Sequence, residues 1–211
     1  MPEPQGPNKL NLGCGADIRS GFLNVDLVNG AGVNLVCDLN RLPWPWADNT
    51  FELVLANHFL EHTDDLIGVL REIWRISRPQ ARLQIRVPYF ASFLSFKDLT
   101  HKHRFTYDAF DNWDARHDAD GRYVTHMNEP MRFHIRRRRI LMFSRLPGWK
   151  YHVANAPFWI PMALMNLFPR LYERFFFFYL PATNIYYELE VVKRAAVPGT
   201  EPCTITGTQP Q

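Results

Sequence analysis

The sequence is poor in cysteine, has no leader-like start and contains no long apolar run. Its three cysteines, Cys14, Cys37 and Cys203, form no CxxC pair and no even framework, so they favour a reduced, cytoplasmic setting over a disulfide scaffold. The start, MPEPQGPNK, lacks the apolar core of a signal peptide. Because no uncharged apolar stretch reaches roughly 18 residues, we expect no transmembrane helix.

An excess of charge of one sign is also missing. The 24 Lys and Arg residues and 21 Asp and Glu residues leave a net charge of only +3, which does not indicate a nucleic-acid partner. Hydrophobic residues make up 46% of the 211 residues, enough for one globular domain with a sizeable core.

Five apolar segments are typical of strands, and an amphipathic segment lies between the last two. We expect the strands at residues 8–12, 22–26, 33–37, 51–56 and 83–87. Leu66, Leu70 and Ile73 recur at helical spacing after Thr63, a candidate N-cap, and Pro79 follows the helix. Strands with interposed connections predict an α/β fold with a doubly wound, mostly parallel sheet.

A glycine turn and an acid follow the first two predicted strands. Gly13-Cys14-Gly15 allows backbone to approach a ligand closely, and Asp26 ends the next strand. Residues 13–21 are too few for a full connecting helix, so we expect a loop there. In parallel sheets ligands bind beyond the carboxyl ends of the strands, where Asp26 would accept hydrogen bonds from ribose hydroxyls.

The pattern changes after residue 88. We expect a long loop over 88–104, a short helix over 107–114 and a strand over 133–143 that contains four consecutive arginines. Leu164, Phe168, Leu171, Phe175 and Tyr179 have helical spacing, interrupted by Pro169. A last strand is predicted at 185–193, followed by a disordered tail at 195–211.

Taken in order, several short motifs resemble the class I S-adenosylmethionine-dependent methyltransferases, in particular the type 11 group. The motifs are Leu12-Gly13-Cys14-Gly15, the strand-end Asp26, Cys37-Asp38-Leu39, Asn57-His58 after the fourth strand, and Glu61-His62. The resemblance implies a Rossmann-like, seven-stranded sheet with an antiparallel last strand and an insert after the fifth strand. It implies one domain over 1–194, with the cofactor core at 9–88, an acceptor or cap insert at 89–183 and the last strand at 184–194.

The resemblance also implies the cofactor S-adenosylmethionine, with S-adenosylhomocysteine as product, and a set of residues that bind it. The methionine part would lie along the backbone of Gly13 and Gly15, and Asp26 would hold the ribose. Asp38 and Leu39 would contact the adenine. Asn57 and His58 would line the pocket below the sulfonium. The predicted cofactor set is Leu12, Gly13, Cys14, Gly15, Asp26, Leu27, Asp38, Leu39, Asn57 and His58. No metal is expected.

Methyl transfer requires alignment of the acceptor and, for a hydroxyl, removal of a proton. His101, in the loop after the fifth strand, is the candidate base or acceptor-orienting group. The candidate acceptor set is His62, Tyr89, His103 and Arg104; the alternative for His101 and His103 is a hydrogen-bonded loop residue, and Arg104 would alternatively pair with Asp98. We therefore predict methyl transfer to a hydroxyl, or a nitrogen, of a small molecule or glycan precursor.

Several alternatives remain open. If the chain does not transfer methyl groups, it is a methyltransferase-fold protein that serves in binding or assembly. A remote alternative is a zinc hydrolase, since residues 58–62 match the HxxEH pattern. Arg136–Arg139 either binds phosphates or an acidic membrane, or forms a salt-bridged edge. The aromatic 157–180 stretch is core, a homodimer interface or a peripheral membrane contact.

Overall fold

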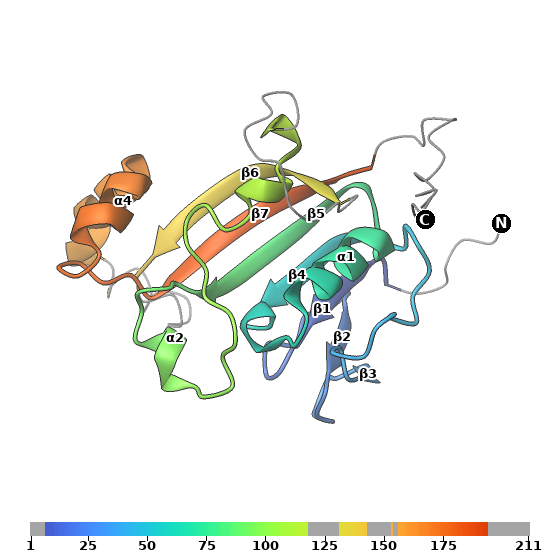
Figure 1. Cartoon of the computed structure of the whole chain (residues 1–211). Coiled ribbons are helices and arrows are strands. Elements are labelled where there is room, and N and C mark those ends of the chain that lie inside the picture. Colours follow the sequence, from blue (N-terminus) through green and yellow to red (C-terminus); the bar gives the residue numbers. More distant parts are fainter. Residues whose placement is uncertain (1–6, 118–130, 143–152, 154–155, 194–211) are drawn as a thin grey trace, which may run out of the picture.

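The computed structural model describes residues 7–117, 131–142, 153 and 156–193, which are built around one seven-stranded sheet (Figure 1). Its strands, in spatial order, are β3 (Leu35–Val36), β2 (Leu23–Asp26), β1 (Lys9–Leu12), β4 (Phe51–Asn57), β5 (Ser77–Pro88), β7 (Asn184–Val192) and β6 (Arg132–Leu141). Strands β1 to β5 pair in parallel, whereas β7 runs antiparallel to both β5 and β6. The predicted α/β fold, its antiparallel last strand included, is confirmed.

The centre of the sheet is buried on both faces. On one face Leu10, Leu12, Val54 and Ala56 have no exposed surface, and on the other face Asn11 and Leu55 are buried too, which explains the near-continuous apolar run of β4. Helix α1 (Leu66–Ile76) packs its buried face against these strands, as Figure 1 shows.

The N-cap of α1 is Asp65, whose Oδ1 accepts a hydrogen bond from the Gly68 N–H at 2.8 Å. The prediction of Thr63 as the cap is wrong. Thr63 is buried, and its hydroxyl donates to the Leu60 carbonyl at 2.9 Å. The cap lies two residues later because the turn η1 (Leu60–His62) comes before the helix.

The connection between β1 and β2 contains no helix, as predicted, and asparagine side chains hold it in place. The buried Asn11 amide donates to the Asp17 carbonyl at 2.8 Å and to Asn24 Oδ1 at 3.0 Å. Asn24 Oδ1 also accepts from the Arg19 N–H at 2.9 Å, and Asn34 Oδ1 accepts from the Asn24 N–H at 2.8 Å. These amides satisfy backbone groups that a helix would otherwise pair within itself.

The insert between β5 and β7 is made of short elements. Besides the strand β6, they are α2 (Leu94–Lys97), the 3-10 turns η2 (Asp111–Trp113), η3 (Ala115–His117) and η4 (Ala156–Phe158), the helices α4 (Trp159–Leu167) and α5 (Pro169–Leu171), and the π-helical segment η5 (Tyr172–Phe176). Pro169 interrupts the helical run as predicted, because α4 ends two residues before it.

The predicted helix over 107–114 is wrong, since only the turn η2 forms there. Asp111 and Asp114 are buried and pair with Arg138 and Arg116, which fixes the segment by side-chain contacts instead. The predicted tail at 195–211 lies outside the described residues. Among the described helices, none is long and apolar enough to cross a membrane.

Candidate active site

The glycine turn and Asp26 lie side by side at the carboxyl ends of β1 and β2. The Gly15 N–H donates to Asp26 Oδ2 at 2.7 Å, and the Val28 N–H donates to Asp26 Oδ1 at 3.0 Å. These two bonds fix the carboxylate, yet each oxygen keeps a second lone pair for a further donor. Asp26 is therefore oriented and still able to accept hydrogen bonds from a ligand.

The two glycines of the turn have different surroundings, although both have a positive φ, +58° at Gly13 and +48° at Gly15. A Cβ at Gly13 would lie 2.9 Å from Cδ2 of Phe59, so this glycine is required by packing within the chain. A Cβ at Gly15 would have no atom within 4 Å. The space above Gly15 is open, as close approach of a ligand to the backbone requires.

The other predicted members of the turn contribute backbone or an apolar surface. Leu12 and Cys14 are buried, and burial, helped by the charge of Asp26, raises the pKa of the Cys14 thiol. Leu27, next to Asp26, is 64% exposed and presents an apolar side chain at the edge of the site.

At the end of β3, Asp38 and Leu39 form a turn. Asp38 accepts a hydrogen bond from the Asn40 N–H at 3.1 Å and pairs with Arg41 at 3.2 Å. The Leu39 side chain is buried, and its carbonyl accepts from the Trp44 indole at 3.0 Å. A contact between this corner and an adenine ring stays a prediction.

Asn57 and His58 follow β4 directly and come close to the glycine loop. The Asn57 amide donates to Asp17 Oδ2 at 3.2 Å. Burial acts to raise the pKa of Asp17, but the hydrogen bonds from Arg19 and Asn57 outweigh it and lower the pKa. Sequence reasoning missed Asp17, because nothing in a loop sequence shows that it meets the end of β4.

His58 adopts a left-handed backbone, with φ of +53°, which is uncommon for a non-glycine residue and costs energy. Its Nδ1 lies 3.1 Å from Oε1 of Glu61, whose side chain has no exposed surface. Because an ionised carboxylate only accepts hydrogen bonds, the imidazole donates here. From the sequence, Glu61 was named only as part of the Glu61-His62 motif and of the HxxEH alternative.

On the acceptor side, the structure brings His62 and His101 together. Their ring centroids are 4.7 Å apart at an interplanar angle of 68°. His101 also lines a hollow of about 470 Å³ with Leu94, Lys97, Asp98 and Leu99. The two imidazoles therefore lie against each other, and His101 borders a space that a small acceptor can enter.

The other predicted acceptor residues lie in different surroundings. Tyr89 is fully buried, and burial raises the pKa of its phenol well above the ordinary value. His103 Nε2 contacts the Thr63 carbonyl at 2.8 Å, which matches the alternative of a hydrogen-bonded loop residue. The exposed Arg104 guanidinium lies 4.5 Å from the centroid of the Phe96 ring. Only His62 and His101 face each other.

The geometry of an HxxEH hydrolase is missing. That motif needs both histidines on one face of a helix. Here His58 has a positive φ, and only the short turn η1 (Leu60–His62) follows it.

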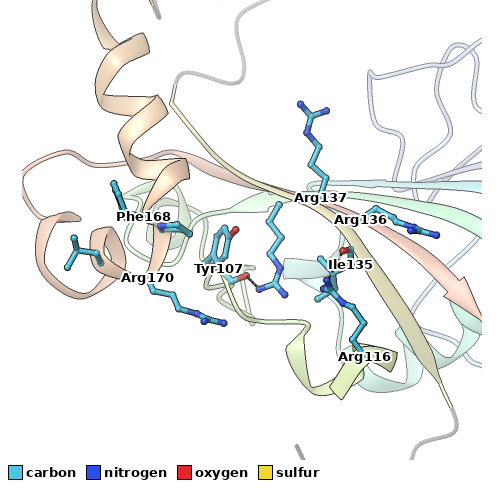
Figure 2. Close-up of a pocket in the computed structure, with 10 residues that line it drawn as sticks. Tyr107, Arg116, Ile135, Arg136, Arg137, Phe168 and Arg170 are labelled. Atoms are coloured by element: carbon cyan, nitrogen blue, oxygen red, sulfur yellow. Dashed lines mark hydrogen bonds between the residues drawn. The ribbon is translucent and has the colours of Figure 1, made fainter. Parts of the chain in front are cut away.

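A second hollow, of about 540 Å³, lies against β6 and is drawn in Figure 2. Arg136 pairs with Glu190 on one side of the strand. Arg138 pairs with Asp108 and Asp111 on the other side. Arg170 pairs with Asp108 at 2.8 Å. Arg136 and Arg138 are thus ion-paired, and their carboxylate partners occupy two of the four guanidinium groups that an anion would need.

Comparison with known proteins bears on the edge that carries Gly15 and Asp26. Residues 10–85 match the family model described as a methyltransferase domain. Residues 10–85 therefore carry a class I S-adenosylmethionine-dependent methyltransferase domain. Its type 11 character, and S-adenosylmethionine as the cofactor of such a domain, were predicted from the sequence and are confirmed.

Relatives of this methyltransferase domain differ in how much they cover. Over 54 residues the chain is 44% identical to a ubiquinone/menaquinone biosynthesis C-methyltransferase, UbiE, from Desulfotalea psychrophila; the match covers 25% of this chain and 21% of the relative. The chain thus matches only about a fifth of that relative's length.

Two solved structures share the fold. A SAM-dependent methyltransferase from Archaeoglobus fulgidus superposes with a TM-score of 0.53 at 13% identity, covering 89% of this chain and 87% of the other. The YcgJ protein from Bacillus subtilis superposes with a TM-score of 0.50 at 12% identity, covering 89% and 92%. At these identities the likeness concerns the fold alone.

Proposed function

We propose that the protein transfers a methyl group from S-adenosylmethionine to a hydroxyl, or a nitrogen, of a small molecule or glycan precursor. The observation that carries the proposal is the 2.7 Å hydrogen bond between the Gly15 N–H and Asp26, beside open space. The cofactor, when bound, supplies an electrophilic methyl group, so the protein mainly has to align the acceptor.

In this proposal the methionine part of the cofactor lies against the backbone of Gly13, Cys14 and Gly15. Asp26 accepts hydrogen bonds from the ribose hydroxyls, with Leu27 beside it. Asp38 and Leu39 contact the adenine, and Asn57 and His58 line the pocket near the sulfonium. The residues fit this role because the Asp26 carboxylate is held by two N–H groups and retains lone pairs.

Calorimetry with S-adenosylmethionine and S-adenosylhomocysteine tests the cofactor site. Asp26→Ala should weaken binding roughly 100-fold, since charge-assisted hydrogen bonds contribute about 1.5–3 kcal/mol each. Asp26→Asn, which keeps an acceptor for the Gly15 N–H, should weaken binding less. Glu52→Ala, an exposed acid on β4, is the control. Absence of heat with either ligand at millimolar concentration would instead leave a binding or assembly protein.

For the acceptor, we propose the hollow that His101 lines, with His101 as the proton-accepting or orienting group and His62 beside it. His101→Ala should lower turnover while leaving the affinity for S-adenosylmethionine unchanged; His134→Ala, a half-buried histidine on β6, is the control. Equal turnover in both variants would remove His101 from the reaction. Transfer of radiolabelled methyl groups into fractionated cell extract identifies the acceptor class.

A contact with an anionic membrane is the partner we propose for the apolar face. This face consists of the exposed side chains Trp159, Ile160, Leu164, Leu167, Phe168, Leu171, Phe175, Phe176, Phe178 and Tyr179. Each of these large apolar side chains is about half exposed or more, and such a gathering over one short segment is typical of an interaction surface. Asn166 bonds α4 to Ile140 at 2.8 Å, which brings the face next to the exposed Arg137 and Arg139 of β6. Apolar side chains flanked by arginines favour the interface of an anionic bilayer.

Co-sedimentation with vesicles tests this contact. The protein should pellet with vesicles that contain phosphatidylglycerol and much less with pure phosphatidylcholine, and Phe178→Ser with Tyr179→Ser should abolish pelleting. Phe93→Ser, an exposed phenylalanine outside the face, is the control. A concentration-dependent dimer without pelleting would assign the apolar face to a second copy of the chain instead.

A further inference from the structure

We propose that Glu61, His62 and His101 bind a divalent metal ion of the zinc class. Each residue offers one ligand atom, and the three atoms lie within 4.8 Å of one another. Ligands of a tetrahedral zinc ion are about 3.4 Å apart, given metal–nitrogen distances of about 2.1 Å. Small rotations of the two rings would therefore bring the three atoms to ligand distance. This donor set differs from the HxxEH pattern, since it replaces His58 with His101.

Two buried atoms of this cluster lack a partner among the described residues. Glu61 Oε2 and His101 Nδ1 are both inaccessible to solvent and make no hydrogen bond there. A buried carboxylate oxygen and a buried imidazole nitrogen without partners are costly. One cation between them would satisfy both atoms at once.

The remaining polar atoms of these side chains are engaged in a way that leaves ligand atoms free. The Thr100 hydroxyl donates to Asp98 Oδ1 at 2.7 Å, so its oxygen accepts the hydrogen bond from His62 Nδ1 at 2.8 Å. This arrangement places the proton on Nδ1 of His62 and leaves the lone pair on Nε2. Metal-bound histidines are usually oriented by such a hydrogen bond on the other ring nitrogen.

Glu61 is oriented in a similar way. His58 holds Oε1 at 3.1 Å, which leaves Oε2 for the metal. The backbone carbonyl of Glu61 accepts hydrogen bonds from the N–H groups of Lys102 at 2.7 Å and His103 at 3.3 Å. These bonds tie the loop that carries His101 to the segment that carries Glu61, so the ligands are positioned before an ion arrives.

Two nitrogens and one carboxylate oxygen suit zinc, and three protein ligands leave a fourth position open. His101 lines the 470 Å³ hollow, so an acceptor oxygen in that hollow would complete the coordination. This role in the acceptor site rests on the proposed methyl transfer. If both hold, His101 acts as a metal ligand, and the metal lowers the pKa of the acceptor hydroxyl. The metal site itself does not depend on the methyl transfer.

The test uses the untagged full chain, stripped with a chelator, with Zn²⁺ titrated by calorimetry and Co²⁺ by visible absorption. We expect one ion per chain, lost in His62→Ala, His101→Ala and Glu61→Gln, with circular dichroism to confirm folding. Thr100→Val, which removes the hydroxyl that accepts from His62 and donates to Asp98, should weaken binding roughly 10–100-fold. His134→Ala should bind as the wild type does.

No zinc or cobalt binding by the folded wild type would overturn the metal site. Binding that survives in His62→Ala and His101→Ala would overturn it too, and a thiolate band in the cobalt spectrum would then assign the ion to cysteine. Calorimetry with S-adenosylhomocysteine in the presence of chelator measures nucleoside binding without any metal. A chain that binds the nucleoside but no metal defeats this inference and leaves the proposed function intact.

Discussion

The β1–β4 side of the sheet and the β5–β7–β6 side are stabilised by different means. On the first side, the loop after β1 is held by buried amides such as Asn11 and Asn24, and by glycines with a positive φ. On the second side, ion pairs such as Arg138 with Asp111 and packed rings such as Phe110 on Tyr187 hold the insert. The edge that carries the glycine turn and Asp26 thus depends on backbone geometry, whereas the β6 edge depends on side-chain partners.

Substitution of the turn glycines tests the first half of this comparison. Gly13→Ala should lower the free energy of unfolding by about 3 kcal/mol, because it adds a clash with Phe59 to the strain of a positive φ. Gly15→Ala should cost only about 1 kcal/mol, since its Cβ would point into open space. Urea unfolding measures both. Equal losses would mean that packing at Phe59 does not distinguish the two positions.

Neutralising single arginines of β6 tests the second half. Arg138→Met should cost about 2 kcal/mol, because it removes a partner of the buried Asp111. Arg136→Met should cost less than about 1 kcal/mol, because its pair with Glu190 is largely solvent-exposed. Thermal unfolding of the two variants gives the comparison. A larger loss for Arg136→Met would contradict our account of this edge.

Acid pH provides the smallest expected effect and tests an ion pair on the first side. The hydrogen bonds from Arg75, and that from the Trp44 N–H at 2.7 Å, lower the pKa of Glu72 below its ordinary value of 4.5, against an opposing effect of burial. A lowered folded-state pKa stabilises the protein above pH 4.5, and this stabilisation is lost as the pH falls through that pKa. Glu72→Gln should therefore flatten the loss of stability in acid by about 1 kcal/mol. An unchanged pH profile of unfolding would show that Glu72 does not contribute to the loss of stability in acid.

The strands, and the edge of the sheet that carries the glycine turn and Asp26, were predictable from the sequence because their signals are local. Alternating or continuous apolar runs mark the strands, and the glycine turn and Asp26 end neighbouring strands only eleven residues apart. Parallel pairing of β1 with β2 then brings their carboxyl ends together. The missing connecting helix was predictable too, because the interval is too short for one.

Only the tertiary structure decided the rest. Thr100 contacts His62 across 38 positions, and Asn57 contacts Asp17 across 40, through loops whose sequences do not encode their path. Tyr89 was predicted at the acceptor but is buried. Glu61 was named only in the Glu61-His62 motif and the HxxEH alternative, but its carboxylate has an oxygen without a hydrogen-bond partner among the described residues, beside the imidazoles of His62 and His101. Periodicity shows which residues are apolar along one segment, whereas contacts between distant loops depend on how the whole sheet and its insert pack. The sequence by itself therefore determined the sheet and the edge that carries the glycine turn and Asp26, and the packing of the insert decided which polar side chains meet around His62 and His101.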